Sequence, residues 1–218
     1  MVSNTNQNKS SVANFGMDFV KEFSTFLFEN KIIQFGNFTL ASGKKSPYYI
    51  DLRLVPSYPH QFRKMVKHLQ NKIIEKIGLE NFDSIVSVPT GGLVIASALA
   101  IETVKPLIYV RSKPKDYGTS KSVEGQIHEG LKVVMIDDVA TTGGSVVKAI
   151  KSLKEAKIKV EDAFVIVNRM EGADEALLEH GVKLHSMLDV LQITKVLNEK
   201  KLVDDLVLKR VENQLGKK

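Results

Sequence analysis

The chain has 218 residues, of which 43% are hydrophobic and 26% are charged, and it contains no cysteine. This composition is typical of a folded globular protein and excludes collagen-like, disulfide-scaffolded and wholly disordered chains. The formal net charge of +6 would suit nucleic-acid binding, but the lysines are interleaved with acids and no tryptophan or zinc-ligand spacing is present, so we expect no nucleic-acid partner.

Residues 1–13 are rich in Asn, Ser and Gln, and we expect them to form a disordered tail. They contain no apolar core of the kind found in a secretory signal. The longest strongly apolar stretch, residues 93–101, is far shorter than the roughly 20 residues of a membrane-spanning helix. We therefore expect a cytoplasmic protein without a membrane partner, whose residues 14–218 form a single domain.

Apolar residues at three- and four-residue spacing predict two helices in the first half of the chain, over residues 14–30 and 59–77. Between them, the segment 38–53 reads as a loop whose YYIDL end could form a strand. Four short apolar runs then predict strands at residues 84–88, 106–110, 132–136 and 163–167. Further helices are predicted at residues 92–103 and 143–156, and one or two within roughly 188–214.

Short strands that alternate with helices predict an α/β fold, with a mainly parallel sheet flanked by helices on both faces. Sheets of this kind bind their ligands at the carboxyl ends of the strands. The residues that follow each predicted strand are therefore the candidates for a functional site.

The strongest candidate site follows the predicted strand 132–136. Two adjacent carboxylates, Asp137 and Asp138, come first, and the run TTGGS (141–145) then leads into an apolar helix. Glycines let the backbone approach an anion closely, and the first N–H groups of a helix point at it, so the pattern predicts a phosphate-binding loop. It matches neither the nucleotide-triphosphate nor the dinucleotide glycine motif. From these residues alone, a plain strand-to-helix turn with a Ser or Thr cap remains the alternative.

The segment 131–150 resembles the phosphoribosyl-diphosphate (PRPP) motif of the type I phosphoribosyltransferases. Three further segments look like signature segments of orotate phosphoribosyltransferase, in the same order along the chain. They are TLASGKKSPYYIDLR (39–53), VPTGG (88–92) and VRSKPKDYGTSKSVEG (110–125). The resemblance covers roughly residues 18–190, and four ordered segments are much more specific than one.

This resemblance implies a type I phosphoribosyltransferase-like fold, with a small N-terminal hood from about 14–55 plus C-terminal elements, and a core of about 56–190. The implied reaction transfers the 5-phosphoribosyl group from PRPP to orotate, giving orotidine 5′-monophosphate and diphosphate in pyrimidine biosynthesis. Mg²⁺ would be carried on PRPP without a direct protein site, in contact with the chain through Asp137 and Asp138. The resemblance also implies a homodimer in which a loop of about 111–125 closes over the neighbouring subunit's site.

By resemblance, Asp137 and Asp138 contact the ribose hydroxyls and stabilise the ribosyl cation that forms as diphosphate leaves. Lys115 is the third expected catalytic residue, as charge stabiliser and proton donor to the departing oxygen. The residues expected to bind PRPP are Thr90, Gly91, Arg111, Lys115, Tyr117, Asp137, Asp138, Val139, Ala140, Thr141, Thr142, Gly143, Gly144 and Ser145.

Orotate is expected to contact Tyr49, Ile50, Thr141 and Arg169, because these residues match the family's orotate-binding positions. The planar guanidinium of Arg169 would hold the planar carboxylate of orotate. Without the resemblance, Arg169 would instead be read as a salt-bridged residue at a strand end.

Three positions depart from the family pattern. Ser112 stands where many bacterial members carry Lys, with Lys113 as a candidate substitute, and Tyr117 stands where many carry His. Ala41 stands where some carry a Lys that contacts PRPP, and whether Lys44 or Lys45 covers that role is left open. Two alternative functions remain: a phosphoribosyltransferase for another base, and a regulator that keeps the fold and binds RNA through its basic surface. The presence of both Arg111 and Lys115 favours catalysis, since a regulator could lose them without penalty.

Overall fold

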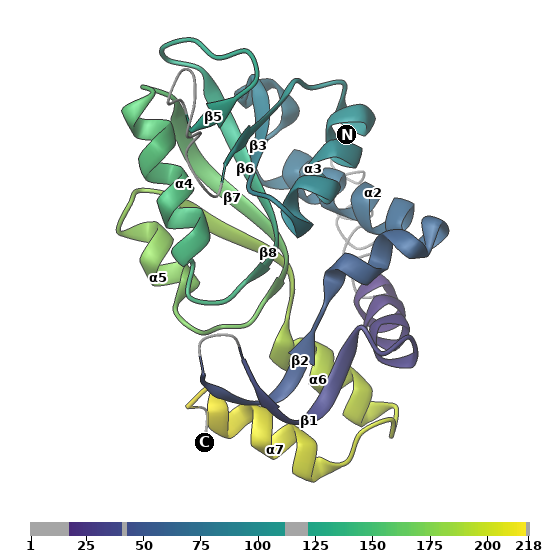
Figure 1. Ribbon diagram of the computed structural model, residues 1–218. Coiled ribbons are helices and arrows are strands. Elements are labelled where there is room, and N and C mark those ends of the chain that lie inside the picture. Colours follow the sequence, from purple (N-terminus) through teal and green to yellow (C-terminus); the bar gives the residue numbers. More distant parts are fainter. Residues whose placement is uncertain (1–17, 41–42, 112–121, 217–218) are drawn as a thin grey trace, which may run out of the picture. The chain divides into compact units, whose positions relative to one another are not determined.

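The computed structural model describes residues 18–40, 43–111 and 122–216. The chain divides into two compact units. Figure 1 shows the elements of both, with colours that follow the residue number. Unit 1 is drawn from Met1–Asp51 and Val190–Lys218, and unit 2 is Leu52–Asp189. Within the described residues, no helix is both long and apolar enough to cross a membrane.

Unit 2 contains a six-stranded sheet with the order β5-β4-β3-β6-β7-β8. Its strands are β3 (Ser84–Ser87), β4 (Leu107–Val110), β5 (Val123–Glu124), β6 (Lys132–Ala140), β7 (Lys159–Asn168) and β8 (Lys183–Asp189). All neighbouring strands are parallel except β4 and β5, which are antiparallel. The predicted α/β fold with a mainly parallel sheet is therefore confirmed.

Helices cover both faces of this sheet (Figure 1). They are α2 (Pro59–Lys76), α3 (Gly91–Thr103), α4 (Gly144–Glu155) and α5 (Ala173–Leu178), with short 3₁₀ helices at η1 (Leu52–Ser57) and η2 (Leu79–Asn81). In α4, the buried residues Val146, Ala149, Ile150 and Leu153 recur at three- and four-residue spacing and join the core cluster formed by the strands. This apolar stripe fixes which face of α4 meets the sheet, and with it the direction of the loop before the helix.

Unit 1 joins the two ends of the described chain. A helix at residues 18–29 precedes an antiparallel pair of strands, β1 (Ile33–Thr39) and β2 (Lys45–Ile50), and the chain returns as α6 (Val190–Glu199) and α7 (Asp205–Gln214). Phe23, Leu27, Tyr48 and Val211 are fully buried. The Phe23 ring stacks between Phe19 and Phe26, with centroid distances of 5.0 and 5.8 Å, so aromatic packing supplies much of this small core.

The structure also corrects the predicted elements. Strands β1 and β8 were not predicted, because their apolar residues are interrupted by polar ones such as Gln34, Asn37 and His185. The region from roughly 188 onward was predicted as helix, whereas β8 continues to Asp189. Strand β6 extends beyond the predicted 132–136, so that Asp137 and Asp138 lie inside the strand and not after it.

Candidate functional site

The candidate site lies at the carboxyl end of β6, in unit 2. Asp137 is 8% exposed, whereas Asp138 is only partly buried. The Asp138 N–H donates to Asp137 Oδ1 at 2.9 Å, and the Val139 N–H donates to Asp138 Oδ1 at 2.8 Å. These local hydrogen bonds fix the direction of both carboxylates at the end of the strand.

Burial raises the pKa of Asp137 from its ordinary value of 3.8 to about 8, and repulsion from the neighbouring Asp138 carboxylate adds to the rise. The free protein therefore keeps a proton on this pair near neutral pH. A cation or a set of donated hydroxyl groups would favour the ionised pair, so the site is suited to a ligand that brings positive charge or hydroxyl donors.

We expect this raised pKa to make the stability of the protein depend on pH. Between about pH 4 and pH 8, folded Asp137 retains a proton that the unfolded chain has released, so the free energy of unfolding should fall by up to about 1.4 kcal/mol per pH unit. The Asn side chain of the Asp137→Asn variant cannot ionise, so this variant should lose the part of the pH dependence that comes from Asp137. Urea unfolding at several pH values should show that the free energy of unfolding of the variant rises relative to that of the wild type as pH increases. A difference between the two free energies that does not change with pH would contradict the raised pKa.

The amino end of α3 packs against the two carboxylates from the neighbouring strand. A Cβ atom on Gly91 would overlap the Asp138 carboxylate, and one on Gly92 would overlap Asp137 and lie 2.9 Å from its Cα. Each glycine thus faces one aspartate. The turn at Thr90 and Gly91, expected to bind diphosphate, therefore lies beside the Asp pair, and its glycines are required by the close approach of those carboxylates.

The loop expected to hold the phosphate connects β6 to α4. Gly143 precedes α4 with a φ of +76°, a conformation that favours glycine, and no side chain caps the helix within the described residues. Thr142, Gly144 and Ser145 are exposed, Val139 and Thr141 are half-buried, and Ala140 is buried at the end of β6. The first N–H groups of α4 are thus available to an anion, as the sequence predicts for residues 139–145.

Arg169 follows β7 and lies beside the end of β6. Its backbone N–H donates to the Ala140 carbonyl oxygen at 2.8 Å. The guanidinium contacts Glu171 Oε1 through Nη2 at 2.9 Å and Nε at 3.0 Å, and the two side chains are only 8% and 4% exposed. The structure thus brings Arg169 to the edge that carries the Asp pair, with a buried carboxylate that compensates its charge.

Arg111 stands where the predicted catalytic loop begins. Its backbone N–H donates to the Ser122 carbonyl oxygen at 2.8 Å, and its Nη1 lies 3.2 Å from Glu124 Oε1. The chain therefore returns in β5 next to the point where it leaves β4. Lys115 and Tyr117, with the departure at Ser112, lie outside the described residues, and so does Ala41.

Tyr49 and Ile50, the other predicted orotate contacts, belong to unit 1. Both lie at the end of β2, where Ile50 is buried and pairs with Ile33 of β1. Tyr49 is half-buried, and its ring packs against Phe38 with the centroids 5.8 Å apart. Their roles toward orotate remain predictions.

Two residues that position the site were not singled out from the sequence. Ser87 is fully buried, and its Oγ donates to the Ile136 carbonyl oxygen at 2.7 Å, which ties β3 to β6 just before the Asp pair. The available signal was a serine between two valines in the predicted strand SIVSV (84–88). Glu171 is the second such residue and forms a salt bridge with Arg169. No pattern in the sequence predicted this salt bridge.

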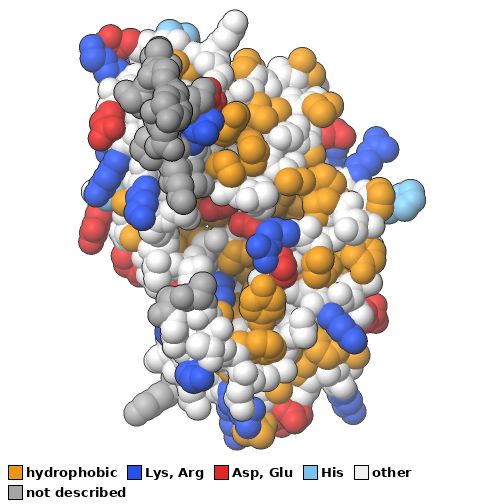
Figure 2. All heavy atoms as spheres, viewed as in Figure 1, with side chains coloured by type: hydrophobic (Ala, Val, Ile, Leu, Met, Phe, Trp, Pro, Cys, Tyr) orange, Lys and Arg blue, Asp and Glu red, His pale blue; other side chains and the backbone are white. Residues whose placement is uncertain are grey.

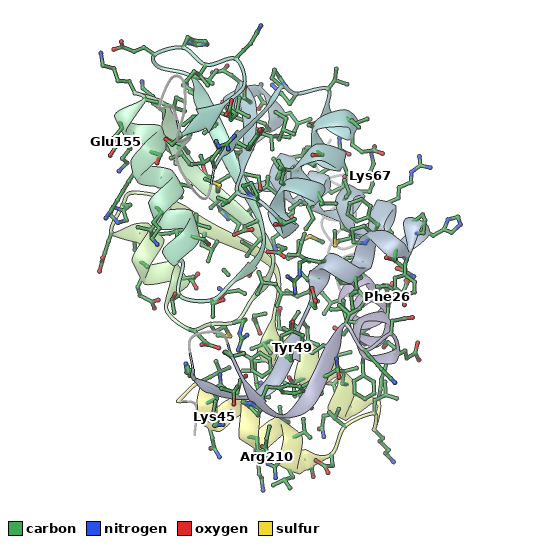
Figure 3. All side chains as sticks on the ribbon, in the orientation of Figure 1. Phe26, Lys45, Tyr49, Lys67, Glu155 and Arg210 are labelled. Carbon is green, nitrogen blue, oxygen red and sulfur yellow. The ribbon has the colours of Figure 1, made fainter. Side chains whose placement is uncertain are left out.

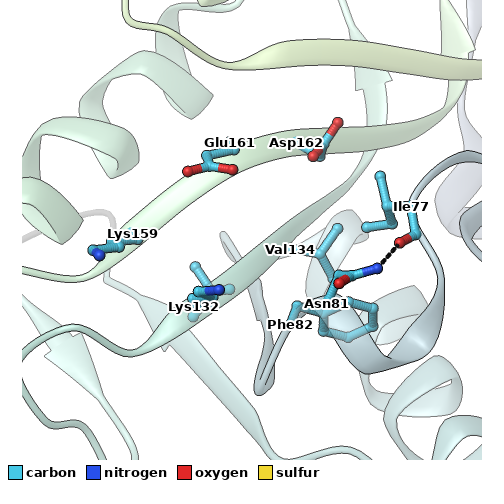
Figure 4. Close-up of a pocket in the computed structure, with 9 residues that line it drawn as sticks. Ile77, Asn81, Phe82, Lys132, Val134, Lys159, Glu161 and Asp162 are labelled. Carbon is cyan, nitrogen blue, oxygen red and sulfur yellow. Dashed lines mark hydrogen bonds between the residues drawn. The ribbon is translucent and has the colours of Figure 1, made fainter.

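A hollow of unit 2, of about 320 Å³, lies at the amino edge of the sheet, opposite the candidate site (Figure 4). Lys132 and Lys159 begin the neighbouring strands β6 and β7 there, and Glu161 and Asp162 follow along β7. Its lining mixes both charge signs and contains none of the predicted site residues. The uncapped helix start that favours an anion lies instead at the carboxyl edge, after the Asp pair.

Known proteins are similar to this chain in sequence and in fold. The family model described as "Phosphoribosyl transferase domain" matches residues 59–179, which include the Asp pair, the loop 139–145 and Arg169. The orotate phosphoribosyltransferase of Cenarchaeum symbiosum is 49% identical over 198 residues, covering 91% of this chain and 99% of that protein. That of Sulfolobus acidocaldarius is 43% identical over 203 residues, covering 89% and 98%. The crystal structure of orotate phosphoribosyltransferase from Aeropyrum pernix matches with a TM-score of 0.71 and 34% identity, over 83% of this chain and 99% of that one.

Proposed function

Because the chain belongs to the phosphoribosyltransferase family, and within it to the orotate phosphoribosyltransferases, we propose that it transfers the 5-phosphoribosyl group of PRPP to orotate. The products are orotidine 5′-monophosphate and diphosphate, and the reaction belongs to pyrimidine biosynthesis in the cytoplasm. The observation that carries the proposal is that the Asp pair, of which Asp137 is buried, lies together with the amino ends of α3 and α4.

The loop before α4 binds the 5′-phosphate of PRPP in this proposal. The uncapped N–H groups of residues 144–146 and the hydroxyls of Thr141, Thr142 and Ser145 are the donors, and the helix dipole adds a favourable field. Because Gly143 adopts a positive φ, the backbone turns sharply enough for successive N–H groups to face one anion.

The Asp pair acts on the ribose in this proposal. Hydroxyl groups at C2′ and C3′ donate to the carboxylates of Asp137 and Asp138, which favours the ionised form that burial disfavours in the free protein. As the bond to diphosphate breaks, positive charge develops at C1′. Two carboxylates in a poorly solvated site stabilise that charge more than they would in water.

Diphosphate leaves toward basic residues and backbone donors. Thr90 and Gly91 supply N–H groups at the start of α3, and Arg111 at the end of β4 supplies a guanidinium. Lys115 and Tyr117 would complete this set from the loop, with Lys115 as the proton donor. The Glu124 carboxylate that contacts Arg111 in the free protein would be exchanged for diphosphate as the loop closes.

Mg²⁺ enters as part of the substrate. Among the described residues, no cluster of three or more His, Cys, Asp or Glu side chains is suited to a metal ion. In this proposal the ion arrives on diphosphate and keeps its waters, which Asp137 and Asp138 would hold. When bound, Mg²⁺ offsets the negative charge of the leaving group.

A homodimer is part of the proposal, since the loop of about 111–125 is expected to serve the neighbouring subunit. The apolar surface of α3 supports it: Ile101 is 81% exposed and Val104, which follows the helix, is 89% exposed. Figure 2 shows hydrophobic side chains gathered over the α2 and α3 part of unit 2. A helix that is apolar on all sides is normally covered on all sides, and a second copy of the chain would cover this one.

Arg169→Ala tests the choice of orotate as substrate. Loss of a charge-assisted contact to the orotate carboxylate should raise the KM for orotate about 10–100-fold, with a much smaller change in the KM for PRPP. Steady-state kinetics with each substrate varied in turn would measure both constants. Because Glu171 would lose its partner, Glu171→Gln and the double variant serve as folding controls. An equal rise in both KM values would assign Arg169 a structural role.

A further inference from the structure

Unit 1 contains a groove that no residue of the proposed active site lines. It has a volume of about 590 Å³ and lies between the strands β1 and β2 and the helix α7. This groove is called the unit 1 groove, and the lining residues used in the argument are Asn37, Phe38, Lys45, Pro47, Arg210 and Asn213. Its volume falls within the roughly 300–1,000 Å³ typical of small-molecule sites.

The charges of the unit 1 groove favour an anion. Lys45 and Arg210 both line it, and no carboxylate does, although α7 also carries Asp205 and Glu212. Figure 3 shows Lys45 on β2 and Arg210 on α7 in the same part of the unit. Arg210 makes no hydrogen bond or ion pair with any other described residue, and Lys45 Nζ donates to Thr39 Oγ1 at 2.7 Å. A guanidinium fork beside an ammonium group is suited to a phosphate group.

The rest of the lining favours a planar ring attached to that anion. The half-buried ring of Phe38 is held in place by Tyr49, with the ring centroids 5.8 Å apart, and Pro47 offers a second apolar surface. The side-chain amides of Asn37 and Asn213 make no hydrogen bond to another described residue. An amide offers both donors and acceptors, which is what the polar edge of a nucleobase requires.

We propose that the unit 1 groove is a second ligand site, which binds a nucleoside 5′-monophosphate. The phosphate lies against Lys45 and Arg210, the base packs against Phe38 and Pro47, and Asn37 and Asn213 bond the base edge. The site goes beyond the proposed transfer reaction, because it is built from unit 1 alone and shares no residue with the PRPP-binding set.

Isothermal titration calorimetry of the full chain with uridine 5′-monophosphate, uridine and inorganic phosphate tests the proposal. The titrations are made with and without saturating PRPP, which fills the proposed active site. Uridine 5′-monophosphate should bind in both conditions, and more tightly than either fragment. Arg210→Ala and Lys45→Ala should weaken it about tenfold or more, because each removes a charge-assisted contact. Lys209→Ala removes the same charge from the exposed neighbouring position and should leave binding unchanged.

Three results would overturn the proposal. The first is equal affinity in the Arg210→Ala, Lys45→Ala and Lys209→Ala variants. The second is equal affinity for inorganic phosphate and uridine 5′-monophosphate, which would mean that the ring wall contributes nothing; Phe38→Leu checks the same point. The third is binding of a single-stranded oligouridylate without binding of the monophosphate, which would assign the groove to nucleic acid. If PRPP itself fails to bind, the proposed reaction is in doubt, while the comparison of variants still decides this site.

Discussion

Lys115→Ala should lower the turnover number by about 10²–10³-fold, because it removes the ammonium group expected to meet the leaving diphosphate in a site closed to water. The midpoint of thermal unfolding should stay within a few degrees of the wild type, since single lysines in loops contribute little to stability. Stopped or continuous assays of diphosphate release, with a melting curve on the same sample, measure both effects. Lys121→Ala, which removes another lysine from the same expected loop of about 111–125, is the matched control.

Mixing of subunits tests whether Lys115 acts across a dimer. Lys115→Ala chains are combined with chains that carry both Asp137→Asn and Asp138→Asn. If the loop serves the neighbouring subunit, each mixed dimer has one site with both lesions and one intact site, so random mixing should restore about a quarter of the wild-type activity. If the loop serves its own subunit, every site remains damaged and mixing restores nothing, which would refute the shared site.

Gly91→Ala should reduce activity about 10–100-fold without unfolding the protein. The new methyl group would overlap the carboxylate of Asp138, which is partly exposed and can rotate away, so the fold survives while the carboxylate leaves its position. The turnover number should therefore fall while the free energy of unfolding changes little. Gly36→Ala, in β1 and outside the PRPP-binding set, is the control, since its Cβ would come no nearer than 3.4 Å to the Phe38 ring.

A double-mutant cycle shows whether Gly91→Ala acts through Asp138. In a chain that already carries Asp138→Ala, the added Gly91→Ala change should have little further effect on activity, because the displaced carboxylate is absent. Additive losses would mean instead that the methyl group blocks the backbone donors at the start of α3. In that case Gly91 would serve the diphosphate directly and not the position of Asp138.

The parts of the fold that could be predicted are those with strong local patterns. The run KVVMI predicted the first half of β6, and the apolar residues of the segment 143–156 predicted α4, so the loop between them could be recognised from its glycines. Strand β8 was not predicted from the sequence, because its segment KLHSMLD mixes polar and apolar residues. Among the described strands it pairs only with β7, so it lies at the edge of the sheet. Edge strands carry a weaker apolar signal because they are less buried.

The contacts between elements could not be read from the sequence. Strand β3 lies between β4 and β6, so Gly91, which follows β3, meets the Asp pair of β6. Along the chain the two are separated by α3, β4, the predicted loop and β5. Sequence spacing does not reveal that strand order. The glycines of VPTGG were therefore interpreted as diphosphate donors alone, and their fit against the two carboxylates became visible in the structure.

The assignment of orotate as the accepting base is tested most directly by diphosphate release from PRPP with a panel of bases. Orotate, uracil, adenine and hypoxanthine are supplied in turn, with Mg²⁺ present and the Asp137→Asn, Asp138→Asn variant as the blank. We expect release with orotate, accompanied by orotidine 5′-monophosphate in equal amount, and none above the blank with the other three. Release with adenine or hypoxanthine but not with orotate would contradict the assignment.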